Sequence, residues 1–120
     1  MTHKTYTSLA KPSKHIVGSG NMGYLTCTYK HLVNMFGDPV IRTDEYKTSA
    51  EWHVEHMHDG EFKGVTAIYD YKQCKTYHGE DGLDVEDITE WNLGGKSSWL
   101  AADLIQFINH PITHEQTNRA

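Results

Sequence analysis

The chain has 120 residues, a formal net charge of −5 and two cysteines. This length predicts one domain that can bury its own core without the help of a disulfide or a metal. The acidic balance argues against general nucleic-acid binding, which needs a basic surface, and two cysteines provide no disulfide framework.

Neither end of the chain carries a strong structural pattern. The first 14 residues are polar and rich in Thr, Ser and Lys, which predicts a flexible N-terminal arm. We expect a single domain over residues 15–112 and a polar tail over 113–120. The chain has no apolar leader and no apolar run near the roughly 18 residues of a membrane span, so a cytosolic location without a membrane partner is expected.

A glycine motif follows a short predicted strand at His15–Val17. Gly18, Gly20 and Gly23 match the spacing G-x-G-x-x-G. A dinucleotide site needs a helix that begins inside this motif, but the next helical pattern begins near Thr28. We therefore interpret residues 18–23 as a flexible glycine loop.

Residues 28–39 predict the first helix. Four side chains have the spacing of a single helical face: Tyr29, Leu32, Val33 and Phe36. Thr28 suits the N-cap, Gly37 suits the left-handed position after the last turn, and Pro39 prevents continuation.

A β-hairpin is predicted next. In the strand at 49–58, Trp52, Val54 and His56 share one side, and the opposite side carries His53, Glu55 and Met57. Asp59-Gly60 is typical of a type I′ turn, and residues 65–72 have the composition of the returning strand. Residues 62–64 leave room for a bulge.

The C-terminal part predicts a polar loop at 73–87, a strand at 88–93 that ends at Gly94-Gly95, and a second helix. The helix has an apolar stripe and a Ser cap at its start, and Pro111 closes it. Together these elements predict an α+β domain with two layers, in which an antiparallel sheet with a central β-hairpin packs against two helices.

The start of the second helix is a candidate anion site. The order strand, Gly-Gly-Lys-Ser, helix places free backbone N–H groups and a lysine together. The motif is not a P-loop, because Glu90 stands where that motif needs glycine. A glycine turn with a Ser cap is the structural alternative. The candidate ligand-binding residues are Trp91, Asn92, Gly94, Gly95, Lys96, Ser97, Tyr71 and Lys72.

The nine histidines raise a metal hypothesis. His56 and His58 lie two apart on a strand and therefore share a face, and His78, Cys74 or Asp59 are candidates to complete the site. A buried core histidine is the alternative for His56. No arrangement of nucleophile and base stands out, so we expect neither a catalytic residue nor a cofactor.

Four stretches of the chain resemble a group of small tailed-bacteriophage proteins: GYLTCTYKHLVNMFGDP, YKTSAEWHVEHMHDG, TAIYDYK and EDITEWNLGG. The resemblance spans roughly residues 23 to 108. The chain departs from the group at His56, where an aromatic residue is more usual, and in its longer DGEFKGV turn. The resemblance implies a viral protein in the host bacterial cytoplasm, and small acidic phage proteins of this kind often act against host defence.

The leading functional hypothesis is therefore a non-enzymatic, homo-oligomeric counter-defence protein. One mechanism blocks a CRISPR-type or other immune effector with an acidic and aromatic surface. A second sequesters a nucleotide immune signal at the helix start. Two alternatives remain open: a small metal-dependent hydrolase or nuclease built on the His-rich hairpin, and a regulatory or structural phage protein.

Overall fold

A five-stranded antiparallel sheet forms the centre of the described part of the molecule. The computed structural model describes residues 3–16, 20–42, 50–70, 84–109 and 117–119. The strand order is β2 (Gly20–Thr26), β6 (Glu90–Gly95), β5 (Glu61–Tyr69), β4 (Ala50–His58) and β1 (Lys4–Ser8). Two short strands extend it: β7 (Thr117–Arg119) runs parallel to β1, and β3 (Ile41–Arg42) pairs with β4.

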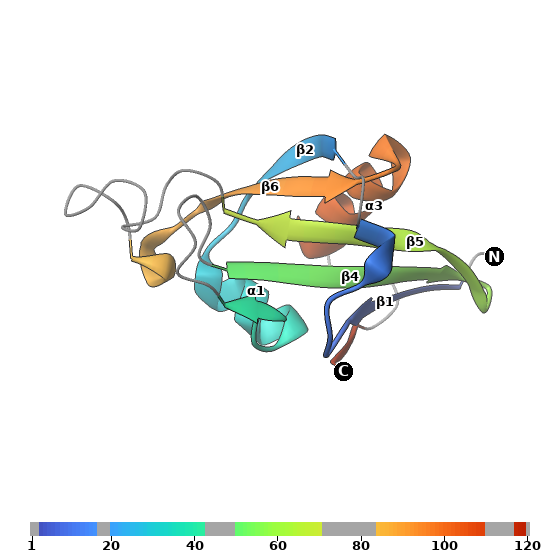
Figure 1. The fold of residues 1–120 in the computed structure, drawn as a ribbon, viewed down its shortest axis with the longest axis horizontal. Helices are drawn as coiled ribbons and strands as arrows, with labels where there is room; N and C mark the ends of the chain where they lie inside the picture. The colour runs from blue at the N-terminus through green and yellow to red at the C-terminus, as the bar shows by residue number, and fades with distance from the viewer. Residues whose placement is uncertain (1–2, 17–19, 43–49, 71–83, 110–116, 120) are drawn as a thin grey trace.

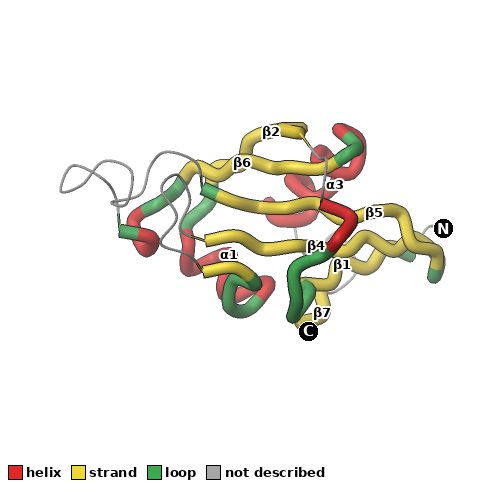
Figure 2. The backbone as a smooth tube through the Cα atoms, viewed as in Figure 1, coloured by secondary structure: helices red, strands yellow, loops and turns green. Residues whose placement is uncertain are grey.

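Two helices cover one face of this sheet. They are α1 (Tyr29–Phe36) and α3 (Ser98–Asn109), and a short 3-10 helix, η3 (Val85–Asp87), precedes β6. A second 3-10 helix, η1 (Lys14–Ile16), crosses the opposite face beside β5 (Figures 1 and 2). The predicted α+β class with an antiparallel sheet, a β-hairpin and two helices is confirmed. No described helix has the length and apolarity needed to cross a lipid bilayer.

The core forms where the helices pack on alternate residues of β4. Trp52, Val54 and His56 are fully buried, as their shared side predicts. The Trp52 indole meets Trp91 of β6 edge-on with 5.4 Å between ring centroids. Each indole N–H also finds a backbone acceptor, Gly37 O at 3.0 Å for Trp52 and Cys27 O at 2.8 Å for Trp91. These bonds connect the sheet to both ends of α1.

The hairpin has the predicted turn and bulge. Asp59 and Gly60 have φ values of 53° and 81°, as a type I′ turn requires. The register then shifts, because Gly64 pairs with His56 whereas Phe62 pairs with the next residue of β4. Gly64 has φ 151°, and a Cβ there would lie 2.9 Å from Leu100 Cδ1 of α3. The glycine therefore lets α3 approach the bulge closely.

The predicted helix caps are confirmed. Thr28 Oγ1 accepts from the His31 N–H at 3.1 Å, and Gly37, with φ 81°, donates to the Val33 carbonyl at 2.8 Å. At the start of α3, Ser97 Oγ accepts from the Leu100 N–H at 3.2 Å.

The prediction of a flexible N-terminal arm is wrong for Lys4–Ser8, because these residues form β1 and pair with β4. The reason is Tyr6, which is fully buried and stacks on Phe107 of α3 with 4.1 Å between ring centroids. Its hydroxyl donates to Asp103 at 2.6 Å. The buried ring and its hydrogen bond thus anchor this polar segment to the core. Likewise, Thr117–Arg119 of the expected tail pair with β1.

The glycine segments also differ from expectation. Residues 20–23 belong to β2 instead of a loop, and Lys14–Ile16 form a 3-10 helix where a strand was predicted. Gly94 and Gly95 are the last two residues of β6 instead of a break after it, and they pair with Asn21 and Gly20. A Cβ on Gly94 would lie 3.1 Å from the Tyr69 ring, so the glycine makes room for an aromatic neighbour.

We expect Tyr6→Ala to lower the free energy of unfolding by about 3–5 kcal/mol, as is typical for loss of a buried aromatic side chain. Thr7→Ala is the matched control on the same strand, and we expect it to cost less than about 1 kcal/mol. Urea denaturation measures both values. Equal costs for the two variants would show that β1 is not part of the core.

Candidate functional site

A cavity of about 280 Å³ lies between the bulge of the hairpin and the start of α3. Residues from three segments far apart in the sequence form its walls: η1, β5, and the start of α3 with the turn before it. The lining residues are His15, Phe62, Lys63, Gly64, Val65, Lys96, Ser97 and Leu100.

Positive charge gathers at this cavity although the chain as a whole is acidic. Lys63 and Lys96 line it from opposite elements, and the first turn of α3 adds the positive end of the helix dipole. Lys63 also makes an exposed ion pair with Glu61, 3.4 Å between Nζ and Oε1. Such an exposed pair is weak, so the Lys63 ammonium can exchange it for another anion.

An aromatic pair forms another part of the wall. The rings of His15 and Phe62 lie 4.9 Å apart between centroids and are tilted by 44°. Phe62 keeps 41% of its surface exposed, so its ring is accessible from solvent. The cavity therefore combines cations with an accessible aromatic surface.

The predicted anion site is only partly the site that the structure forms. Lys96 and Ser97 line the cavity, and Gly94 and Gly95 are buried in the strand that leads to it. Trp91 lies in the core, where it cannot contact a ligand at the surface. The side chain of Asn92 instead contacts β2, where Asn21 Nδ2 donates to Asn92 Oδ1 at 3.0 Å. The candidates Tyr71 and Lys72 lie outside the described residues.

The sequence interpretation missed the walls that come from elsewhere in the chain. Phe62 and Lys63 belong to a predicted bulge, and an apolar residue beside a turn was the available signal. No local pattern could place His15 beside them, because η1 and β5 are far apart in the sequence and meet only in the folded chain.

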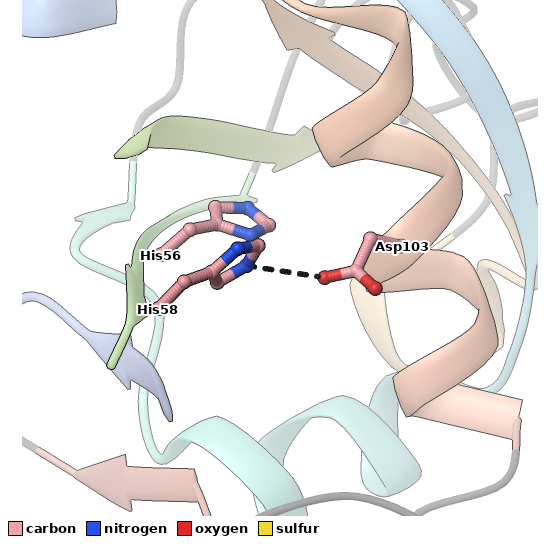
Figure 3. A group of neighbouring side chains, drawn as sticks. All are labelled: His56, His58 and Asp103. Atoms are coloured by element: carbon pink, nitrogen blue, oxygen red, sulfur yellow. Dashed lines mark ion pairs between the residues drawn. The ribbon is translucent and has the colours of Figure 1, made fainter. Parts of the chain in front are cut away.

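A second group of polar side chains lies under α3. His56 and His58 of β4 face Asp103 of α3, and one ligand atom from each residue lies within 4.8 Å of the other two (Figure 3). Across the strand pair, Lys4 lies opposite His58 and Tyr6 opposite His56. Lys4 Nζ donates to Asp103 Oδ1 at 2.8 Å, and the Tyr6 hydroxyl donates to Oδ2.

The protonation states in this group follow from burial and its hydrogen bonds. Burial lowers the pKa of His56 to about 4, with the Asp103 carboxylate opposing the shift, so the imidazole is neutral near pH 7. Burial alone would raise the pKa of Asp103, but the hydrogen bonds from Lys4 and Tyr6 bring it below its ordinary value. Burial and the bond to Asp103 raise the pKa of Tyr6.

The other predicted metal ligands do not join this group in the described structure. Asp59 Oδ1 accepts from the His3 N–H at 2.7 Å in the hairpin turn. His78 and Cys74 lie outside the described residues. The sequence did not indicate Asp103, the carboxylate that faces the two histidines. A single acidic residue within an apolar helical stripe does not match the spacing of any metal-binding motif.

Cys27 lies just before α1 and is partly buried. Its thiol donates to the Thr28 carbonyl at 3.4 Å, and burial raises its pKa to about 11. Because the thiolate is the reactive form, this cysteine is a poor nucleophile near neutral pH.

No protein-family model, curated protein or solved structure matches this chain.

We expect Cys27 to react slowly with iodoacetamide in the folded protein. In a Cys74→Ser background at pH 8, a pKa near 11 instead of 9.0 leaves about 100-fold less thiolate than in the unfolded chain. Mass spectrometry of the alkylated fraction over time gives the rates with and without urea. The folded rate should keep rising until the pH approaches 11, and equal rates at pH 8 would contradict the burial of the thiol.

Proposed function

We propose that this protein binds a small phosphate-bearing nucleotide in the cavity between β5 and α3, and that it acts as a phage counter-defence protein which sequesters a nucleotide immune signal. The observation that carries the proposal is the composition of the cavity wall: two lysines, a helix start and an aromatic pair surround one space. These are the groups that recognise a phosphate and a base.

The phosphate end is supported by charge. Helix N-termini bind anions because their first N–H groups have no partner within the helix. Ser97 already satisfies the Leu100 N–H, so the ammonium groups of Lys63 and Lys96 provide most of the attraction. A phosphate carries the negative charge that these groups match.

The base end is supported by the aromatic pair. Nucleobases stack on aromatic rings irrespective of sequence, and Phe62 offers an exposed ring at the edge of the cavity. A volume of about 280 Å³ is near the lower end of the range for small-molecule sites. The cavity therefore suits one nucleotide unit, with the rest of a larger signal outside it.

The counter-defence role rests on the resemblance to small phage proteins. Sequestration requires only binding. It therefore fits a cavity whose described walls carry lysine and aromatic side chains and no thiol. The net charge of −5 favours the alternative mechanism, in which the protein blocks a basic surface of a host immune effector. Homo-oligomers and a location in the host bacterial cytoplasm remain part of this proposal.

We expect Lys96→Ala to weaken nucleotide binding about tenfold, because it removes one charge-assisted contact with the phosphate. Isothermal titration calorimetry with cyclic dinucleotides, cyclic trinucleotides and ADP-ribose measures the affinity. Lys30→Ala removes the same charge from the exposed surface of α1 and should leave the affinity unchanged. Absence of binding to all three classes, or equal losses in both variants, would reject the cavity as a nucleotide site.

We expect Phe62→Ala to separate base recognition from phosphate recognition. Loss of the ring should weaken nucleotide binding about tenfold or more, since stacking on an aromatic side chain contributes about 1–3 kcal/mol per base. Binding of inorganic pyrophosphate should stay the same, because the lysines remain. The same titrations test both ligands, and a nucleotide affinity unaffected by the substitution would show that the ring pair does not hold the base.

A further inference from the structure

We propose that His56, His58 and Asp103 bind one divalent metal ion of the zinc class, which joins β4 to α3. This site is separate from the residues that line the proposed nucleotide cavity. The inference therefore stands or fails independently of the proposed function.

The three side chains converge from two elements. Residues two apart on a strand point to the same side, so both imidazoles of β4 face α3, where Asp103 faces back (Figure 3). Their ligand atoms lie within 4.8 Å of one another, and His58 Nε2 is 3.8 Å from Asp103 Oδ2. A tetrahedral zinc ion with bonds of about 2.0–2.1 Å separates its ligands by about 3.4 Å. Binding would therefore require side-chain rotations that bring the ligand atoms closer together.

In the described part of the chain, two buried imidazole nitrogens lack the hydrogen-bond partners that buried polar atoms normally have. His56 Nδ1 and His58 Nε2 have no hydrogen-bond partner among the residues that the structure describes. His56 is fully buried, and His58 is 7% exposed. An unsatisfied buried polar atom costs about 1–3 kcal/mol, and native proteins contain few of them. One metal ion would satisfy both nitrogens.

The other contacts of the group orient these atoms for binding. Thr66 Oγ1 lies 2.8 Å from His56 Nε2. With the proton on Nε2 donated to Thr66, Nδ1 keeps its lone pair and is free to ligate. Metal-bound imidazoles are oriented in this way by a partner on the second nitrogen. Tyr6 similarly fixes the Asp103 carboxylate through Oδ2, and the remaining lone pairs of the carboxylate stay available.

Lys4 would compete with the metal ion for the Asp103 carboxylate. Its ammonium lies 2.8 Å from Asp103 Oδ1 and 5.5 Å from the centre of the exposed Trp99 ring. A second cation at this carboxylate would be repelled by the ammonium. Because the Lys4 side chain retains 25% exposure, it can turn toward solvent when a metal binds.

The donor set and burial define the kind of ion. Two imidazoles with one carboxylate suit zinc and its neighbours, whereas calcium and magnesium prefer sites made of oxygen atoms. All three ligands are buried, so an ion bound here would be shielded from a substrate.

The first test is titration of the purified full chain with Co²⁺, followed by its visible d–d absorption, and with Zn²⁺ in competition. We expect one tightly bound ion per chain. In His58→Gln and in Asp103→Asn the affinity should fall at least about 100-fold, since each variant lacks one ligand. His31→Gln is the control because it removes an imidazole of α1 outside the cluster. It should bind as the wild type does.

Lys4→Gln provides a test that does not depend on a damaged core. Removal of the competing ammonium should raise the affinity several-fold. ¹⁵N NMR of the histidine rings in the wild-type protein should show zinc-dependent shifts at His56 Nδ1 and His58 Nε2. The proposal is overturned if the wild-type chain binds no stoichiometric ion, if His31→Gln loses as much affinity as His58→Gln, or if these two nitrogens do not respond to zinc.

Discussion

The fold depends on the burial of one side of β4 beneath the two helices. Strand geometry sends alternate side chains to that side, so Trp52, Val54 and His56 enter the same core. A shift by one residue would move the tryptophan to the other side of the sheet and bring Glu55 into the core. The type I′ turn at Asp59-Gly60 fixes this register.

The same register brings both candidate sites close to α3. Gly64 pairs with His56 across the hairpin and allows Leu100 to approach closely, which places the first turn of α3 against the bulge. The cavity forms at that turn. About one helical turn further along α3, Asp103 reaches the two histidines of β4. The cavity and the buried polar group therefore lie on neighbouring turns of the same helix.

Local chemistry was predictable from the sequence, whereas contacts between distant segments were not. Thr28, Gly37 and Asp59-Gly60 determine their own backbone, so the caps and the turn were predicted correctly. The pairing of β1 depends on Tyr6 meeting Phe107, a contact that no local pattern indicates. His15 and Asp103 were missed for the same reason. Lys96, which lines the cavity, was already a candidate because a lysine beside a helix start is a local feature.

The most direct test of the nucleotide proposal is amide chemical-shift mapping with the tightest-binding of the cyclic nucleotides and ADP-ribose. The wild-type protein, labelled with ¹⁵N, is titrated at low salt and its backbone resonances are followed. We expect the largest shifts at residues 62–65 and 96–100, on two walls of the cavity. Largest shifts in α1 or β2, with these two segments unaffected, would contradict it.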